Sequence, residues 1–347
     1  MPLRHFGIGG KAGAAPGRLR GQAVFWLKAL SQPTIDISLR THAGLRTRIV
    51  ECPGTSLPPE ELAALVAQLR EVAAKTLSND SLSYGIFSGE PERLARAIVT
   101  LISEEETGRP IAFNALSVMH VTLDGAATDV THLGLVMVDP DVRGQGLSWV
   151  LYGLTALLLF ARDGLRLKWF SNVTQVPAVA GMVSETFSDV YPSPLSSARQ
   201  SFAHLQLARE IMTHHRAVFG VGEDAGFDET RFVITNSYTG GSGALKKTLA
   251  DAPKHRNELY NDFCAHELDY ERGDDLLQLG RLDLATARRY LMSDVPHGSL
   301  PTLIAASALL ALQRLVLPIV YWMDDTRAFG TLRPRIRRAM IKMADGR

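Results

Sequence analysis

The stretch VMVDPDVRGQGLSWVLYGLTALLLFA, residues 136–161, decides the fold. An apolar strand ends at Val138, a short polar loop holds Gly144 and Gly146, and a strongly apolar helix follows directly. Glycines allow a ligand to approach the backbone, and the N–H groups and dipole of a helix start attract anions. Strand, loop and helix alone are also typical of an ordinary turn. With the added charge of Arg143, the stretch predicts a phosphate-binding loop, although it lacks the GxxxxGK[ST] pattern of a P-loop.

Strands and helices alternate on both sides of this stretch, which predicts a layered α/β fold. Before it we expect strands at residues 46–51, 111–123 and 130–138, and helices at residues 58–72 and 91–101. Asp124-Gly125 is a turn signal that joins the last two strands as an antiparallel hairpin. After it we expect a strand at residues 167–171, helices at residues 177–187 and 197–219, and a last strand at residues 231–237.

The loop residues are more specific than this layout. Val138-Asp139-Pro140 followed by Arg143-Gly144-Gln145-Gly146-Leu147-Ser148 resembles the pyrophosphate-binding signature R/Q-x-x-G-x-G/A of the GCN5-related N-acetyltransferase (GNAT) superfamily. Ser148 departs from it, because the family prefers glycine or alanine there. The resemblance implies a GNAT-like fold, a mixed and mostly antiparallel twisted sheet flanked by helices. It further implies that acetyl-CoA or another acyl-CoA is held by Val136, Val138, Arg143, Gly144, Gln145, Gly146, Leu147, Ser148 and Asn172.

In this superfamily an acyl group passes directly from the CoA thioester to an amine, with no covalent enzyme intermediate. The resemblance places a bulge in the strand before the loop, and Gly134 fits it; a plain core glycine is the alternative. His132 on the same strand is our candidate general base, because an imidazole titrates near working pH. A structural role is its alternative, and His120 on the facing strand is a second candidate base.

The family often has a tyrosine in the helix after the fifth strand whose hydroxyl protonates the leaving thiolate. Counting back from Phe187 places Met182 at that position, so this acid is missing or comes from elsewhere. Tyr191 is the nearest tyrosine along the chain and our candidate acid, and Tyr152 lies on the preceding helix.

The ends of the chain differ from its middle. We expect a basic, disordered leader over residues 1–35, an acyl-CoA-binding catalytic domain over residues 36–240, and a helical C-terminal extension over residues 245–347. For the leader, an amphipathic surface contact and a transit peptide are the alternatives. Within the extension, helices are expected at residues 257–270, 284–292 and 300–322. The last of these has the length and composition of a buried core helix, an interfacial helix or a membrane span. We expect it to pack or to lie at a membrane surface rather than to span.

Composition excludes some classes of function. The 347 residues include 37 Lys and Arg against 36 Asp and Glu, a net charge of +1 that argues against nucleic acid as a partner. Two separated cysteines fit neither a disulfide framework nor a metal knuckle, so we expect no metal and a cytoplasmic location. The sequence predicts a CoA-dependent N-acyltransferase acting on an amine of unknown identity. There are two alternatives. One is a long-chain acyltransferase that uses fatty acyl-CoA or acyl carrier protein and makes peripheral membrane contact. The other is a non-catalytic binding module of the same fold.

Overall fold

The computed structural model describes residues 32–42, 44–77, 85–143, 145–147, 149–295 and 297–325. The chain divides into two compact units. One is Thr34–Ala311, which contains the sheet, and the other consists of Met1–Pro33 with Leu312–Arg347. Residues 1–31 of the expected leader lie outside the described residues. The expected boundary between residues 240 and 245 falls within the unit Thr34–Ala311.

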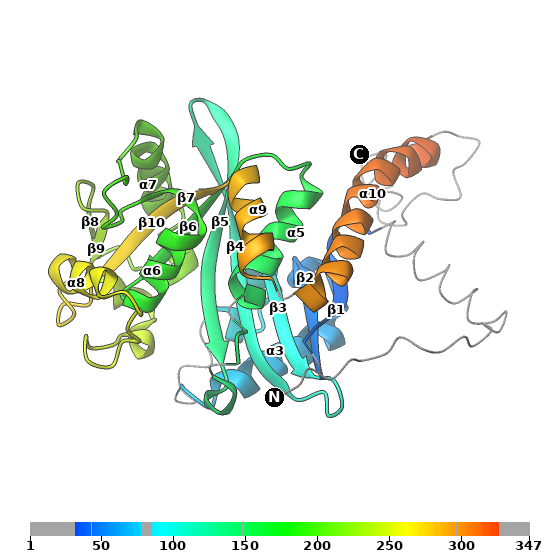
Figure 1. Ribbon diagram of the computed structural model, residues 1–347, viewed down its shortest axis with the longest axis horizontal. Helices are drawn as coiled ribbons and strands as arrows, with labels where there is room; N and C mark the ends of the chain where they lie inside the picture. Colours follow the sequence, from blue (N-terminus) through cyan, green and yellow to red (C-terminus); the bar gives the residue numbers. More distant parts are fainter. Residues whose placement is uncertain are drawn as a thin grey trace, which may run out of the picture. The chain divides into compact units, whose positions relative to one another are not determined.

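The described part of this unit is built around one twisted sheet of ten strands (Figure 1). Their order is β1-β2-β3-β4-β5-β6-β10-β9-β8, and β7 also pairs with β10. The strands are β1 (Asp36–His42), β2 (Leu45–Glu51), β3 (Ala97–Glu104), β4 (Pro110–Leu123), β5 (Ala126–Val138), β6 (Lys168–Thr174), β7 (Ser188–Tyr191), β8 (Gly226–Asp228), β9 (Val233–Thr235) and β10 (Asp275–Leu282). Neighbours are antiparallel except β5 and β6, which pair in parallel. The expected mixed, mostly antiparallel sheet is therefore confirmed.

Helices cover both faces of the sheet. The α-helices are α2 (Pro53–Ser56), α3 (Pro59–Ala73), α4 (Pro91–Leu94), α5 (Thr155–Arg162), α6 (Pro177–Thr186), α7 (Phe202–His214), α8 (Glu258–Glu267), α9 (Leu284–Ser293) and α10 (Leu300–Asp325). Successive side chains of a strand point to opposite faces of the sheet. On β6, Phe170 packs with α5, α6 and α9, whereas Trp169 packs with α7. On β3, Leu101 packs against α3 on the same face as α7, and Ile102 packs on the same face as α5. We call these the α5 face and the α7 face.

Two central strands differ from the expectation. Residues 97–104 form β3 rather than the end of a helix, and α4 ends at Leu94. Within the expected helical extension, Asp275–Leu282 is the strand β10, which lies between β6 and β9. A strand covered on both faces is apolar throughout, and its period of two is then hidden. The expected last strand, at residues 231–237, is the short β9 beside it.

The helix α10 confirms the helix expected at residues 300–322. Its segment Leu303–Trp322 has a mean hydropathy of 2.1 and is the one described helix long and apolar enough to cross a membrane. Only 22% of that window is buried in the protein, so most of its side-chain surface faces outward.

Candidate functional site

A bulge and a fork interrupt the sheet at β5. On β4, Ala115 pairs with Leu135 and Ser117 pairs with His132, so two residues of β5 oppose one of β4. Gly134 lies in this bulge, where an added Cβ would be 2.1 Å from the Ala115 carbonyl oxygen. A glycine is therefore required at this point of the strand, as the bulge expectation proposed.

The parallel pairing of β5 with β6 runs from Val130↔Trp169 to His132↔Ser171. Beyond these pairs β5 stays on β4 up to Val138, whereas β6 stays on β10 up to Thr174. We call the space between residues 133–138 of β5 and residues 172–174 of β6 the fork. Across the fork these two segments form no strand pairs with each other.

A buried ion-pair cluster fixes the loop that follows β5. The side chain of Asp139 is fully buried, accepts from Lys75 and, at 2.9 Å, from Nη1 of Arg109, and accepts from the Asp141 N–H at 3.0 Å. The Lys75 ammonium holds the pKa of this carboxyl below its usual range. The buried carboxylate thus holds the start of the loop to α3's neighbour Lys75 and to Arg109, whose own side chains are about one third exposed. Sequence reasoning did not find this cluster, since Lys75 and Arg109 are distant along the chain.

The helix after the loop begins with a widened turn. Residues Trp149–Leu154 are π-helical, and α5 continues directly from them. Asn114 of β4 donates its side-chain amide to the Leu151 carbonyl within this turn. The expected apolar helix is confirmed, although its first turns are not α-helical. Such turns often occur next to functional sites.

The predicted loop residues lie at the end of β5 as expected. Arg143, Gln145 and Gly146 are exposed, whereas Leu147 is buried in the core and accepts from the N–H groups of Val150 and Leu151. Gly146 has a φ of +73° with nothing within 4 Å of an added Cβ, so its surroundings are open. Gly144 and Ser148 lie outside the described residues.

The other predicted CoA-contacting residues flank the fork on the α5 face. Val136 and Val138 pack at the edge of the core cluster that contains α5. Asn172 is 2% exposed, and its amide donates to Gln278 at 3.2 Å. Gln278 in turn donates to the Ala180 carbonyl, Ser184 and the Pro192 carbonyl, which ties β6 and β10 to α6. Asn172 therefore has a structural partner in addition to its proposed role.

His132, the candidate base, lies on the opposite, α7 face. It is 3% exposed, its Nδ1 is 3.0 Å from Ser171 Oγ, and its ring packs at a tilt against Phe219 with centroids 5.1 Å apart. Burial lowers its pKa to about 4. A neutral imidazole is a proton acceptor, but one with so low a pKa is a weak base, and the role of His132 in catalysis stays a prediction.

The buried imidazole has a consequence for stability. The unfolded chain takes up a proton at His132 near pH 6.5, whereas the folded protein resists it down to about pH 4. This contribution to stability is therefore complete above pH 6.5 and is lost as the pH falls toward 4, by about 3 kcal/mol in total. Urea unfolding of the wild type and of His132→Gln at pH 7 and pH 4.5 checks it. We expect their difference in unfolding free energy to shrink at the lower pH, and a constant difference would contradict the burial argument.

The other predicted proton-transfer groups are not at the fork. Tyr191 lies on β7, separated from β6 by β10, and its hydroxyl donates to the Thr230 carbonyl at 2.8 Å. Tyr152 is in the π-helical turn, where burial raises its pKa to about 12. His120 is exposed near the hairpin tip and lies 2.6 Å from Asp129. The structure thus gives the fork no tyrosine from among these candidates.

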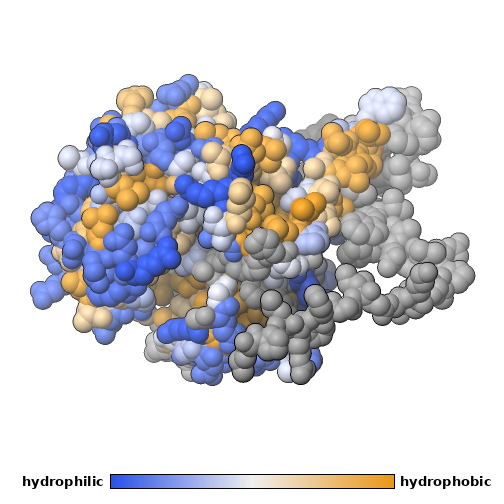
Figure 2. Space-filling view, viewed as in Figure 1, coloured by the Kyte–Doolittle hydropathy of each residue, from blue (hydrophilic) through white to orange (hydrophobic). Residues whose placement is uncertain are grey.

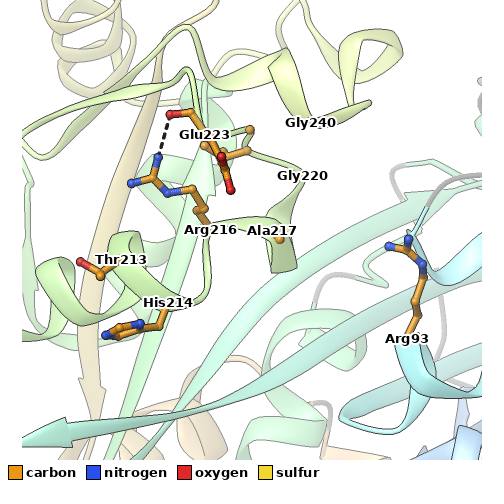
Figure 3. Close-up of a pocket in the computed structure, with 10 residues that line it drawn as sticks. Arg93, Thr213, His214, Arg216, Ala217, Gly220, Glu223 and Gly240 are labelled. Atoms are coloured by element: carbon orange, nitrogen blue, oxygen red, sulfur yellow. Dashed lines mark hydrogen bonds between the residues drawn. The ribbon is translucent and has the colours of Figure 1, made fainter.

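A cavity of about 680 Å³ opens on the α7 side of the molecule (Figure 3). Arg93 forms one wall. The other wall comes from the end of α7 and the loop after it, together with Gly240 from the turn after β9: Thr213, His214, Arg216, Ala217, Gly220, Val221, Gly222 and Glu223. Arg216 braces this loop by donating to the Met212 carbonyl at 2.6 Å and the Glu223 carbonyl at 3.3 Å. No pattern in the sequence indicated this cavity.

Both walls are attached next to the bulge. Phe219 lies between the lining residues Ala217 and Gly220, and its ring packs against that of His132. On the other side, the Arg96 carbonyl, close to Arg93 in the chain, accepts from the Val118 N–H at 3.0 Å. Because Ser117 pairs with His132, these anchors lie side by side on β4 and β5. The loop wall is therefore anchored beside the bulge, on the face opposite to Asn172 and Val136.

Comparisons with known proteins find no matching family model and no matching curated protein. Solved structures similar to the chain include a GNAT family acetyltransferase from Brucella melitensis in complex with acetyl-CoA, at 20% identity and a TM-score of 0.25, covering 38% of this chain and 76% of that one. They also include the ribosomal L7/L12 alpha-N-protein acetyltransferase RimL, at 13% identity and a TM-score of 0.27, covering 44% and 82%. A third is the ribosomal-protein-S5-alanine acetyltransferase from Vibrio fischeri, at 11% identity and a TM-score of 0.28, covering 70% and 96%.

At such identities and TM-scores these likenesses carry no argument about activity. The strand order, the bulge in β5, and the single parallel pair of β5 with β6 beside the glycine loop are observations on this chain itself. Together they form the mixed, mostly antiparallel sheet with a bulged strand before the loop that the resemblance in residues 138–148 implied.

Proposed function

We propose that this protein is a CoA-dependent N-acyltransferase that binds acyl-CoA in the fork and an amine in the cavity. The observation that carries the proposal is the bulge and fork in β5, directly before a loop whose start is fixed by the Asp139 cluster. The fork offers strand N–H groups to a pantetheine chain, and the loop offers N–H groups and Arg143 to a pyrophosphate.

The chemistry needs no metal and no covalent intermediate. The neutral amine attacks the thioester carbonyl and a C–N bond forms. The nitrogen then loses a proton, the C–S bond breaks, and the thiolate takes up a proton and leaves as CoA. A backbone N–H at the bulge would donate to the carbonyl oxygen as it becomes negative. Holding the two substrates on opposite faces of one strand, at the bulge, brings them together in a fixed orientation.

Titration calorimetry followed by a thiol-release assay tests this function. We expect the protein to bind acetyl-CoA and to release CoA thiol when the correct amine from a panel is added. Tighter binding and faster thiol release with palmitoyl-CoA would favour the long-chain alternative. CoA binding without thiol release for any amine would favour the non-catalytic module, and no binding of either thioester would contradict the proposal.

A matched pair of variants tests the acceptor cavity. Ala217 lines it, whereas the next residue, Val218, is 42% exposed and does not. Ala217→Glu narrows the cavity, so we expect it to raise the KM for the best amine at least about tenfold, whereas Val218→Glu leaves it unchanged. Calorimetry should show the same CoA affinity in both. Equal KM values in the two variants would place the acceptor elsewhere.

A further inference from the structure

The helix α10 has two apolar stripes, and only one of them is covered. Leu303, Ala306, Leu310 and Gln313 are buried and recur every three or four residues. Ile304, Ala308, Ala311, Leu315, Ile319 and Trp322 recur in the same way and are exposed. Leu315 is 69% and Trp322 is 67% exposed, and Figure 2 shows apolar residues gathered over α10. We call the second set the outer stripe.

The first turns of α10 are fixed to the folded unit. Leu303, Ala306 and Leu310 belong to the same core cluster as α5 and α9. They are therefore not free to cross a bilayer. From Leu312 to the end of the helix at Asp325 the rise of 1.5 Å per residue gives roughly 21 Å, against about 30 Å of hydrocarbon. The helix suits a position on a bilayer surface better than a span.

Charge is divided unevenly between this helix's neighbours and the rest of the chain. Residues 1–35 contain five Lys or Arg and no acidic residue, and residues 326–347 contain seven against one. The remaining residues, 36–325, hold 25 basic and 35 acidic side chains. The near-neutral net charge of the whole chain is therefore the sum of two basic terminal segments and an acidic middle part.

Both basic segments are joined to the same helix. The second follows α10 directly in the chain. The first ends close to it, because Gln313 of α10 donates to the Gln32 carbonyl. An apolar stripe flanked by basic segments is the pattern of a helix that lies in the interface of an anionic membrane, with Tyr321 and Trp322 of the kind found at that depth.

We propose that the outer stripe of α10 binds the surface of a bilayer that contains anionic lipid, with its apolar side chains in the interface; the positive charge of the adjoining sequence segments favours anionic headgroups. This attachment does not depend on the proposed acyltransferase activity. It would hold the protein at the membrane surface without involving the residues of the fork.

Flotation of the full chain with vesicles tests this surface. We compare phosphatidylcholine vesicles with phosphatidylcholine–phosphatidylglycerol vesicles, at low and high salt. The wild type should float with the anionic vesicles, and added salt should weaken binding. Leu315→Glu with Ile319→Glu should reduce binding by at least about a hundredfold, since each removes a buried apolar side chain from the interface.

Met292→Glu is the matched control, because Met292 is 67% exposed on α9 and lies outside the stripe. It should bind vesicles as the wild type does, and thermal unfolding should be the same in all three proteins. The proposal is overturned if the wild type ignores both vesicles or if the double variant binds as well as the control. It is also overturned if the stripe instead joins two copies, seen as a lipid-free dimer that the double variant abolishes. Retention of the protein in membranes after carbonate extraction would show a span and overturn it as well.

Discussion

Gly146→Glu should lower the affinity for CoA by at least about a hundredfold while leaving the protein folded. The position has a φ of +73° and open space around it, so the new side chain fits but projects into the ligand's place. Its carboxylate also repels a pyrophosphate across a short distance. Titration calorimetry with CoA measures the effect. The same affinity in variant and wild type would show that the loop does not hold the pyrophosphate.

Gly125→Glu is the control for this experiment. Gly125 has a φ of +76°, again with nothing within 4 Å, but it lies in the hairpin turn between β4 and β5, at the other end of β5 from the loop. Both variants therefore incur the same backbone strain, about 1–2 kcal/mol, and the same change of charge. Only a difference in CoA binding between them reports on the loop.

Gly134→Ala should destabilise the protein by about 2–4 kcal/mol and lower turnover by at least about tenfold. An added Cβ would lie 2.1 Å from the Ala115 carbonyl oxygen, a backbone atom that cannot move aside without breaking the register of β4 with β5. The bulge would straighten or shift, and its N–H groups would no longer face the thioester. Thermal unfolding and the thiol-release rate measure both parts.

Gly243→Ala serves as the comparison, because Gly243 has open space and an ordinary backbone conformation. We expect it to behave as the wild type does. If Gly134→Ala matched it in both stability and turnover, the bulge would not be the element that the proposed chemistry needs.

Residues close in the sequence predicted the central part of the fold well. The hairpin of β4 and β5, the loop at residues 139–147, and the helices α3, α6, α8 and α9 follow from apolar spacing and turn residues. By contrast, β3 and β10 are covered on both faces, so their apolar residues do not alternate. The position of β10 beside β6 also depends on pairing across about a hundred residues, which no local pattern records.

The candidate site was predictable only where one segment supplies it. The glycine loop and Gly134 lie on a single stretch of chain, and the structure places both at the fork. Tyr191 is the nearest tyrosine along the chain, but β10 lies between its strand and β6. The cavity walls join Arg93 to the loop after α7, so only the folded chain brings them together.

Amide hydrogen exchange with and without CoA tests the central claim most directly, because it reports where CoA binds without any substitution. We expect CoA to slow exchange in residues 133–147, which form the bulge, the end of β5 and the loop, and to leave the hairpin tip near Gly125 unchanged. Protection elsewhere in the chain with none in residues 133–147 would contradict acyl-CoA binding in the fork.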